Sequence, residues 1–326
     1  IHIGTDFKKA RNYVLEAVRK KGIYNPQKTR GVGAWYDSGD VVFNTGAELS
    51  VNGKLTAYEQ YQSKFLYQSY GEQIVCLEKT ATRRDLDLVI QAGDSLQWDK
   101  KAYSSMLIGF CVQACLSPLF KWRSHLWLTG EQGNGKSTVQ NRFPRALLGN
   151  MLLSVGSETT AAGIRQRLGS HPLAVSFDEA EARTEADKSR LRQLNGLARA
   201  SSSGETVLKG TTSGNNMEFL LRSCFIMSSI KPFTEHKSDE SRYALLELQI
   251  PDADHKPGGV HYEAFKEACD AFEEDGFSDR FITYVISQAG ERKRFQEQAR
   301  GLLMSTNIKT SRLLDQYSQL IGCFLM

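Results

Sequence analysis

The chain has 326 residues, of which 40% are hydrophobic and 24% are charged, and its formal net charge is +4. This composition is ordinary for a soluble globular protein, and the length suits two units or one elaborated domain. The mildly basic charge permits a polyanionic partner and is weak support for one by itself.

The six cysteines and six histidines contain neither a C-x-x-C nor an H-E-x-x-H pattern, so we expect a reduced, intracellular protein without structural zinc. The longest apolar region, from Met106 to Phe120, is interrupted by polar residues and by Pro118, which favours a buried helix over a membrane span. The first residue is Ile1 rather than Met, so the chain is expected to be a fragment or a processed protein.

Residues 1–97 are predicted to form a small α+β accessory or oligomerisation domain. Apolar residues at helical spacing predict a helix over residues 5–20. From Gly31 to Leu55, short apolar runs alternate with turn clusters such as Asn52-Gly53, which predicts an antiparallel meander. Residues 58–70 carry five tyrosines or phenylalanines, which would either stack on nucleic-acid bases or be buried against the meander.

Helices are predicted over residues 83–92 and 101–117, and a larger α/β unit, the core of the chain, over residues 98–252. Within this core, Leu126-Trp127-Leu128 precedes the segment Gly130-Glu131-Gln132-Gly133-Asn134-Gly135-Lys136-Ser137-Thr138. An apolar strand, a glycine-rich loop and a helix in this order are the context of the phosphate-binding P-loop. The glycines allow a tight turn that aims backbone N–H groups at phosphate oxygens, Lys136 reaches the β- and γ-phosphates, and Ser137 can ligate Mg²⁺.

An acidic pair follows the next strongly apolar strand, Leu173-Ala174-Val175-Ser176-Phe177. Asp178 at the end of this strand can hold Mg²⁺ directly or through water, and Glu179 can polarise a water for attack on the γ-phosphate. Glu181 is a weaker candidate for the same role. The expected fold is α/β, because predicted strands alternate with helices around a mostly parallel sheet.

Further along the chain, a strand from Phe219 to Met227 ends in Ser228-Ser229, and either serine could contact the γ-phosphate. The hairpin predicted between residues 201 and 216 carries Lys209, a candidate phosphate hook for DNA together with Gly210 and Thr211, or an ordinary surface lysine. Arg242 precedes a strand and could enter a neighbouring subunit's site or form a surface ion pair with Asp239 or Glu240. Residues 253–326 read as a helical region with a basic cluster at Arg292-Lys293-Arg294.

Taken in order, these parts resemble the AAA+ helicases of superfamily 3, and most closely the replicative helicases of phages and mobile elements that are fused to primase or primase–polymerase domains. The resemblance rests on Gly130–Ser137 (Walker A), Phe177-Asp178-Glu179 (Walker B), the hairpin Val207–Thr211, Ile226–Ser229 (sensor 1) and Arg242 (arginine finger). One departure is that such helicases usually carry Asn where this chain has Ser229.

The resemblance implies a AAA+ P-loop ATPase that binds ATP and Mg²⁺ between the subunits of a homohexameric ring. It also implies that the Lys209 hairpins move along single-stranded DNA. The expected location is the cytoplasm of a bacterial or virus-infected cell, and a primase or polymerase domain is an expected further partner. Two alternatives stay open: a AAA+ switch or loader that remodels proteins without moving on DNA, and a binding module in which the P-loop only stabilises assembly.

Overall fold

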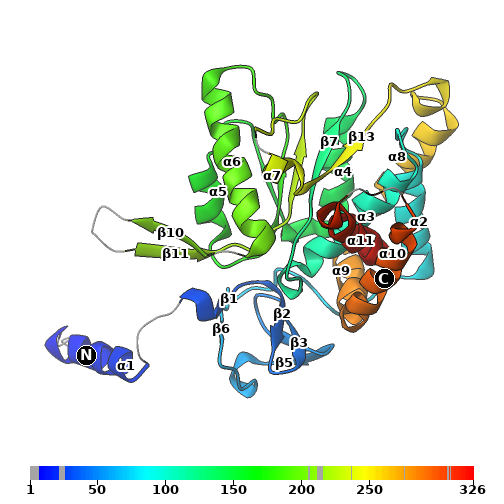
Figure 1. The fold of residues 1–326 in the computed structure, drawn as a ribbon. Helices are drawn as coiled ribbons and strands as arrows, with labels where there is room; N and C mark the ends of the chain where they lie inside the picture. Colours follow the sequence, from blue (N-terminus) through cyan, green and yellow to red (C-terminus); the bar gives the residue numbers. More distant parts are fainter. Residues whose placement is uncertain are drawn as a thin grey trace, which may run out of the picture.

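The computed structural model describes residues 7–21, 26–204, 206–210, 216–235, 237–274, 276–306, 308 and 310–326. Its centre is a five-stranded sheet of order β13-β7-β12-β9-β8 in which every neighbouring pair is parallel (Figure 1). The strands are β7 (His125–Thr129), β8 (Leu152–Val155), β9 (Ala174–Phe177), β12 (Phe225–Ser228) and β13 (Tyr243–Glu247). The predicted α/β architecture with a mostly parallel sheet is therefore confirmed.

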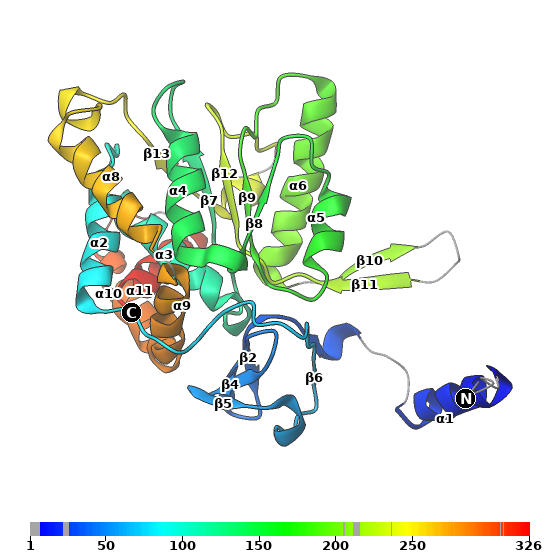
Figure 2. The ribbon, with the colours of Figure 1, turned by 180° about the vertical axis from the view of Figure 1, so that it is seen from behind.

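Both faces of this sheet are covered by helices, which explains why its strands are mostly apolar. Along β7, Leu126 and Leu128 face one hydrophobic cluster and Trp127 faces the other, as the two-residue period of a strand requires. The first cluster contains α3 (Ala102–Cys115), α4 (Lys136–Leu148), α8 (Val260–Phe272) and α9 (Phe277–Ser287). The second contains α5 (Ala161–Leu168) and α6 (Glu185–Ser203), and Figures 1 and 2 show α6 and α4 on opposite faces.

The predicted N-terminal helix and meander are both present. Helix α1 (Phe7–Lys21) has exposed side chains from Phe7 to Arg19. The meander consists of the antiparallel strands β2 (Gly33–Asp37), β3 (Asp40–Asn44), β4 (Leu49–Val51) and β5 (Lys54–Thr56), and next to it β1 (Thr29–Arg30) pairs with β6 (Leu66–Tyr67). The Tyr58 and Tyr67 hydroxyls donate to Asn44 and Asp37, so these aromatic residues pack against the meander.

The meander lies below the five-stranded sheet in Figure 1, at the end where the parallel strands begin. Its residues Val32, Ala34 and Phe43 belong to the same hydrophobic cluster as α3 and α4, and this cluster extends to Cys323. Helix α2 (Arg83–Asp94) packs on α3 and α8. The core is thus continuous across residues 97 and 252, and the division into 1–97, 98–252 and 253–326 stays a prediction.

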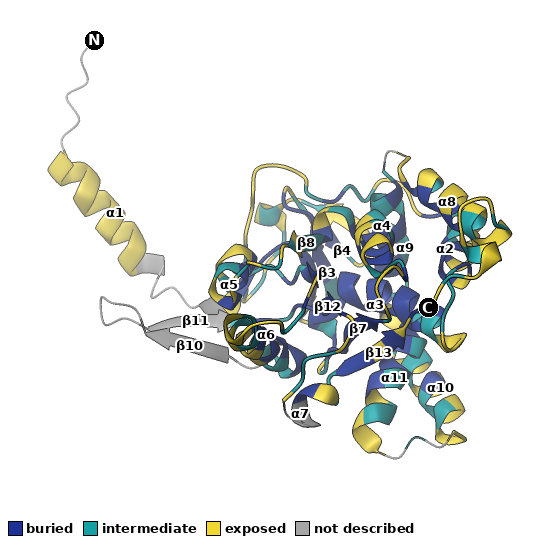
Figure 3. Ribbon diagram, turned by 90° about the horizontal axis from the view of Figure 1, so that it is seen from above, coloured by how far each residue is buried: buried dark blue, intermediate teal, exposed yellow. Residues whose placement is uncertain are grey.

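The C-terminal region is helical, as predicted, and ends with α10 (Arg292–Met304) and α11 (Ser311–Phe324). Helix α11 packs closely on α3 at Gly109, where a Cβ atom would lie 1.9 Å from the Leu320 carbonyl oxygen. Figure 3 shows α3 buried within the helical layer and α1 exposed from Phe7 to Arg19. None of the helices in the described ranges is both long enough and apolar enough to cross a membrane.

Helix α4 continues through Pro144 to Leu148, and Phe143 and Leu147 on either side of the proline are fully buried. One predicted strand differs from the structure. The strand expected from Phe219 to Met227 is two strands, β11 (Asn216–Leu220) and β12. Between them the Ser223 N–H bonds the Ser201 hydroxyl at the end of α6 rather than a neighbouring strand. The hairpin partner of β11 is β10 (Thr206–Gly210).

Candidate nucleotide-binding site

The P-loop connects the end of β7 to the start of α4 in a conformation that depends on glycine. Gly130 has φ of 141°, and a Cβ atom there would lie 2.5 Å from the Leu248 carbonyl oxygen. Gly135 is the N-cap of α4 with φ of 80°, in the left-handed region that favours glycine. The loop therefore sits at the positive end of the α4 dipole, where an anion is stabilised.

Lys136 is the first residue of α4, and its ammonium group is folded back on the loop. Its Nζ donates to the carbonyl oxygens of Gly130 and Glu131, each at 2.7 Å. Burial lowers the pKa of Lys136, while the carboxylates of Glu181 and Asp178 act in the opposite direction. A partly desolvated cation held by two neutral carbonyls gains interaction energy when a phosphate replaces them.

Asp178 follows β9 and accepts hydrogen bonds from two other elements of the site. The Ser137 hydroxyl of α4 donates to Oδ1 at 3.2 Å, and the Ser228 hydroxyl at the end of β12 donates to the same oxygen. Parallel strands end at the same edge of a sheet, which explains why residues fifty positions apart in the chain meet here. The structure thus brings Asp178 and Ser137, both candidate Mg²⁺ ligands, into direct contact.

Glu179 and Glu181 differ in what surrounds them. Glu179 is exposed, lines the cavity beside the P-loop, and has φ of 55°, which is uncommon for a residue other than glycine. Glu181 lines the same cavity, but its Oε1 accepts a hydrogen bond of 2.6 Å from the Ile230 N–H. Glu181 therefore fixes the backbone after β12, whereas the carboxylate of Glu179 is exposed beside the cavity.

The two serines that end β12 point to different neighbours. Ser229 is 1% exposed, accepts a hydrogen bond from Trp127 Nε1 at 2.7 Å, and donates to the Lys231 carbonyl at 2.8 Å. Ser228 contacts Asp178. Geometry thus gives Ser228, rather than Ser229, the position next to the acidic residue. Only its place one residue earlier in the chain distinguished it in sequence.

Two cavities adjoin the P-loop, and four loop residues line both of them: Gln132, Gly133, Gly135 and Thr138. The first, of about 410 Å³, contains Lys136, Ser137, Asp178, Glu179 and Arg183. The second, of about 390 Å³, is walled by apolar residues of α4, the segment after β13, and α8, among them Val139, Leu248, Pro251, Tyr262 and Phe265. This second cavity could not be predicted from the sequence, because its wall comes from distant segments without a shared motif. Arg183 also lies in no motif that marks it as a site residue.

The other residues of the predicted phosphate loop have different surroundings. Glu131 is exposed and contributes its carbonyl to Lys136. Asn134 is 7% exposed, and its side-chain amide donates to the Leu248 carbonyl at 2.7 Å, which fastens the loop to the segment after β13. Asn134 can therefore meet a ligand with its backbone but not with its amide.

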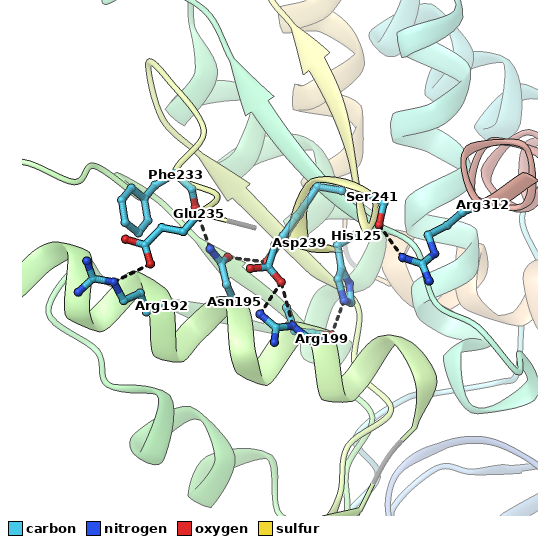
Figure 4. Close-up of polar contacts among 11 residues, drawn as sticks. His125, Arg192, Asn195, Arg199, Phe233, Glu235, Asp239, Ser241 and Arg312 are labelled. Carbon is cyan, nitrogen blue, oxygen red and sulfur yellow. Dashed lines mark hydrogen bonds and ion pairs between the residues drawn. The ribbon is translucent and has the colours of Figure 1, made fainter. Parts of the chain in front are cut away.

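The other predicted site residues are not part of this cavity. Arg242 precedes β13 at the opposite end of the sheet, roughly 20 Å along the strand direction from the loop, and its guanidinium lies 5.3 Å from the centre of the Trp122 ring. Asp239, a candidate ion partner of Arg242, is paired with Arg199 at 2.6 Å (Figure 4). Lys209 lies in β10 opposite Met217, and Gly210 opposite Asn216, so both are strand residues rather than the hairpin tip. Thr211 lies outside the described residues.

The residues present fit a magnesium–nucleotide complex. The Ser137 hydroxyl and the Asp178 carboxylate are adjacent oxygen ligands of the type that Mg²⁺ prefers. The loop, Lys136 and the α4 N-terminus supply cationic and N–H groups for phosphates, and the apolar second cavity adjoins the same loop. The arrangement can therefore hold a nucleoside triphosphate across the P-loop.

No protein-family model matches the chain, and no curated protein matches it. Among solved structures, the fold is similar to a protein described as "SCCmec type IV Cch - active helicase", with a TM-score of 0.50 and 13% sequence identity. The similarity covers 97% of this chain and 58% of that one, so this chain spans less than two thirds of that protein's length. At this identity the comparison shows the fold alone: an α/β, P-loop-like fold of the kind found in a helicase.

Proposed function

We propose that this chain is an ATP-dependent DNA helicase of the AAA+ superfamily 3 type, acting in replication of a phage or mobile element. The observation that carries the proposal is the meeting of Lys136, Ser137, Asp178 and Ser228 around one cavity at the end of the parallel strands. Such a set of a loop cation, a hydroxyl and a carboxylate is what hydrolysis of a nucleoside triphosphate requires.

The roles of the residues follow from their neighbours. Lys136 exchanges the carbonyls of Gly130 and Glu131 for phosphate oxygens, and the loop N–H groups hold the same phosphates. Ser137 and Asp178 would hold Mg²⁺, which supplies charge neutralisation when it is bound. Ser228 fixes the orientation of the Asp178 carboxylate, and Glu179 orients the attacking water as general base.

The proposed assembly is a homohexameric ring in the cytoplasm, with Arg242 of one copy completing the ATP site of the next. The position of Arg242 at the far end of its own sheet supports a role between copies, because it cannot reach the P-loop of the same chain. The hairpin of Lys209, Gly210 and Thr211 would follow single-stranded DNA through the ring, and a primase or polymerase domain would act beside it.

The test is the steady-state ATPase rate with and without single-stranded DNA, measured over a range of protein concentrations and at low and moderate salt. We expect DNA to stimulate the wild-type rate and Lys209→Ala to lose the stimulation, whereas the control Lys266→Ala on α8 keeps it. The rate per subunit should rise with concentration if neighbouring copies complete the site. An ATPase rate that is the same with and without DNA at every protein concentration would contradict the helicase proposal. It would favour a AAA+ switch that remodels proteins.

A second comparison separates hydrolysis from nucleotide binding. Glu179→Gln is expected to keep ATP binding and to reduce turnover by at least roughly a hundredfold, as removal of a general base does. Glu181→Gln keeps a hydrogen-bond acceptor for the Ile230 N–H and should retain most of the turnover. Unchanged turnover in Glu179→Gln would refute the catalytic assignment and leave a nucleotide-binding module.

A further inference from the structure

Apart from the two cavities beside the P-loop, a larger groove lies at the opposite end of the sheet, between the meander and the C-terminal helices. It has a volume of about 1070 Å³, compared with about 410 Å³ for the cavity around Lys136. One wall is the β2–β3 hairpin with Tyr36, the floor is the loop from Leu119 to Trp122, and the other wall comes from α10 and α11. This volume reaches the upper limit of small-molecule pockets, which suits a polymeric ligand.

The side chains that line this groove carry an excess of positive charge. Lys121, Arg292, Lys293 and Arg312 line it, together with one carboxylate, Asp315. The carboxylate is already paired with Arg300 of α10. Lys121 and Lys293 are exposed, and within the described ranges neither has a carboxylate partner. The groove therefore presents unneutralised cations to a ligand from both the floor and the α10 wall.

The basic cluster Arg292-Lys293-Arg294 is only partly in the groove, because Arg292 and Lys293 line it and Arg294 does not. Arg294 pairs with Glu291 at 3.0 Å and lies over the Phe295 ring, outside the groove. Arg292 and Lys293 line the groove, and the Arg292 guanidinium is held by a hydrogen bond of 2.7 Å to the Ala289 carbonyl. The start of α10 thus places Arg292, held by the Ala289 carbonyl, and the exposed Lys293 beside the meander.

Aromatic rings accompany these cations. Tyr36 is on the outward face of β2 and is 57% exposed, although its neighbours Trp35 and Asp37 are buried. The Trp122 ring at the floor lies near two guanidinium groups, with Arg242 at 5.3 Å and Arg312 at 6.0 Å from the ring centre. An exposed ring beside a row of cations is the combination that binds a base and its backbone phosphate together.

We propose that this groove binds single-stranded nucleic acid, with the phosphate backbone along Lys121 and Lys293 and a base stacked on Tyr36. The aromatic wall favours nucleic acid over an acidic peptide, and a single strand over a duplex, because only unpaired bases expose a face for stacking. The groove is separate from the Lys209 hairpin and from the P-loop, so its binding does not depend on ATP hydrolysis.

The test is fluorescence anisotropy of a labelled oligothymidylate without nucleotide, in the full chain carrying Lys209→Ala to remove the hairpin's contribution. We expect K121E/K293E to bind roughly tenfold more weakly or worse, and the slope of log K against log salt to fall by about 1.4 for two lost phosphate contacts. The matched control K79E/K266E has the same net charge and exposed positions outside the groove, and should bind as its parent does. Equal binding by the two double variants would overturn the proposal.

Stacking is tested at Tyr36. Tyr36→Ala should weaken binding about fivefold or more and Tyr36→Phe should restore it, because the ring and not the hydroxyl supplies the contact. Trp122 fluorescence, compared with a Trp122→Phe variant, should be quenched on binding. Polyglutamate that competes as well as the oligonucleotide would overturn the nucleic-acid assignment. Binding that survives Lys136→Ala would support this groove even if the ATPase proposal failed.

Discussion

Ser228 and Ser229 are neighbours at the end of β12, and we expect their alanine variants to have different effects. Ser228→Ala should lower ATP turnover, whereas Ser229→Ala should lower the free energy of unfolding. The Ser228 hydroxyl donates to Asp178 Oδ1, and Ser228 lines the cavity beside the P-loop. Loss of a group that orients a metal-binding carboxylate typically lowers activity by about 10- to 100-fold. We therefore expect Ser228→Ala to lower kcat by that factor while the free energy of unfolding changes by less than about 1 kcal/mol.

Ser229→Ala should have the opposite effect. The Ser229 hydroxyl receives the indole N–H of Trp127, whose side chain is completely buried between the sheet and α6. Its removal leaves that N–H without an acceptor in a dry environment, at a cost of about 1–3 kcal/mol in unfolding free energy. Because the hydroxyl does not contact Asp178, the surviving folded protein should keep most of its turnover.

The assay is ATP turnover together with urea denaturation of both variants, with Ser228→Thr as the control that keeps a hydroxyl beside Asp178. Trp127 can report the unfolding by its fluorescence, since it lies in the buried sheet. Loss of turnover in Ser229→Ala without loss of stability, combined with a wild-type rate in Ser228→Ala, would refute this division of roles. That result would indicate that Ser229, and not Ser228, lies next to the γ-phosphate.

Three further outcomes follow from the same contacts. Lys136→Ala should abolish hydrolysis, yet leave the nucleotide-free unfolding free energy within about 1 kcal/mol, because burial lowers the pKa of Lys136 and so opposes its charge; a large destabilisation would show a structural role. Burial lowers the pKa of His125 to about 3 from an ordinary 6.5, so the unfolded chain takes up the proton first. His125 should therefore lower the unfolding free energy by about 1.4 kcal/mol per pH unit as pH drops from about 6 toward 4, and His171, whose pKa burial lowers to about 4, adds to this fall. The measurement is the urea midpoint at each pH, and a flat profile would contradict neutral burial. Arg199→Ala should lower the unfolding free energy by about 2 kcal/mol, because Asp239 is 3% exposed and loses its cation, while Arg199→Lys should restore part of it in the same denaturation assay.

Local chemistry made the phosphate loop and the sheet predictable from sequence. The glycines of the P-loop occupy conformations that other residues rarely adopt, so their spacing is visible without knowledge of the fold. Apolar runs such as Leu126–Leu128 and Leu173–Phe177 mark strands that are buried on both faces. Asp178 could be placed at a strand end for the same reason.

Features that depend on distant segments could not be predicted in this way. Whether Ser228 or Ser229 faces Asp178 depends on the twist and register of β12 against β9, which adjacent serines do not encode. The continuation of α4 past Pro144 depends on burial of Phe143 and Leu147, a tertiary effect that outweighs the local preference of proline. The apolar cavity beside the loop has the same origin, because its wall is assembled only when α8 packs beside α4.

The P-loop cavities and the basic groove lie at opposite ends of the sheet, which constrains how the proposed motor would work. The two cavities lie where the parallel strands end, whereas Arg242, Trp122 and the basic groove lie where the strands begin. Arg242 and Arg312 share the Trp122 ring, and the Arg312 guanidinium also donates to the Ser241 hydroxyl, next to Arg242 (Figure 4). If Arg242 completes the ATP site of a neighbouring copy, the contacts among Arg242, Trp122 and Arg312 connect that ATP site to the groove. A ligand that draws Arg312 away from the Ser241 hydroxyl would act one residue from Arg242. We therefore expect nucleic acid in the groove to alter ATP turnover in the adjacent copy of the proposed ring.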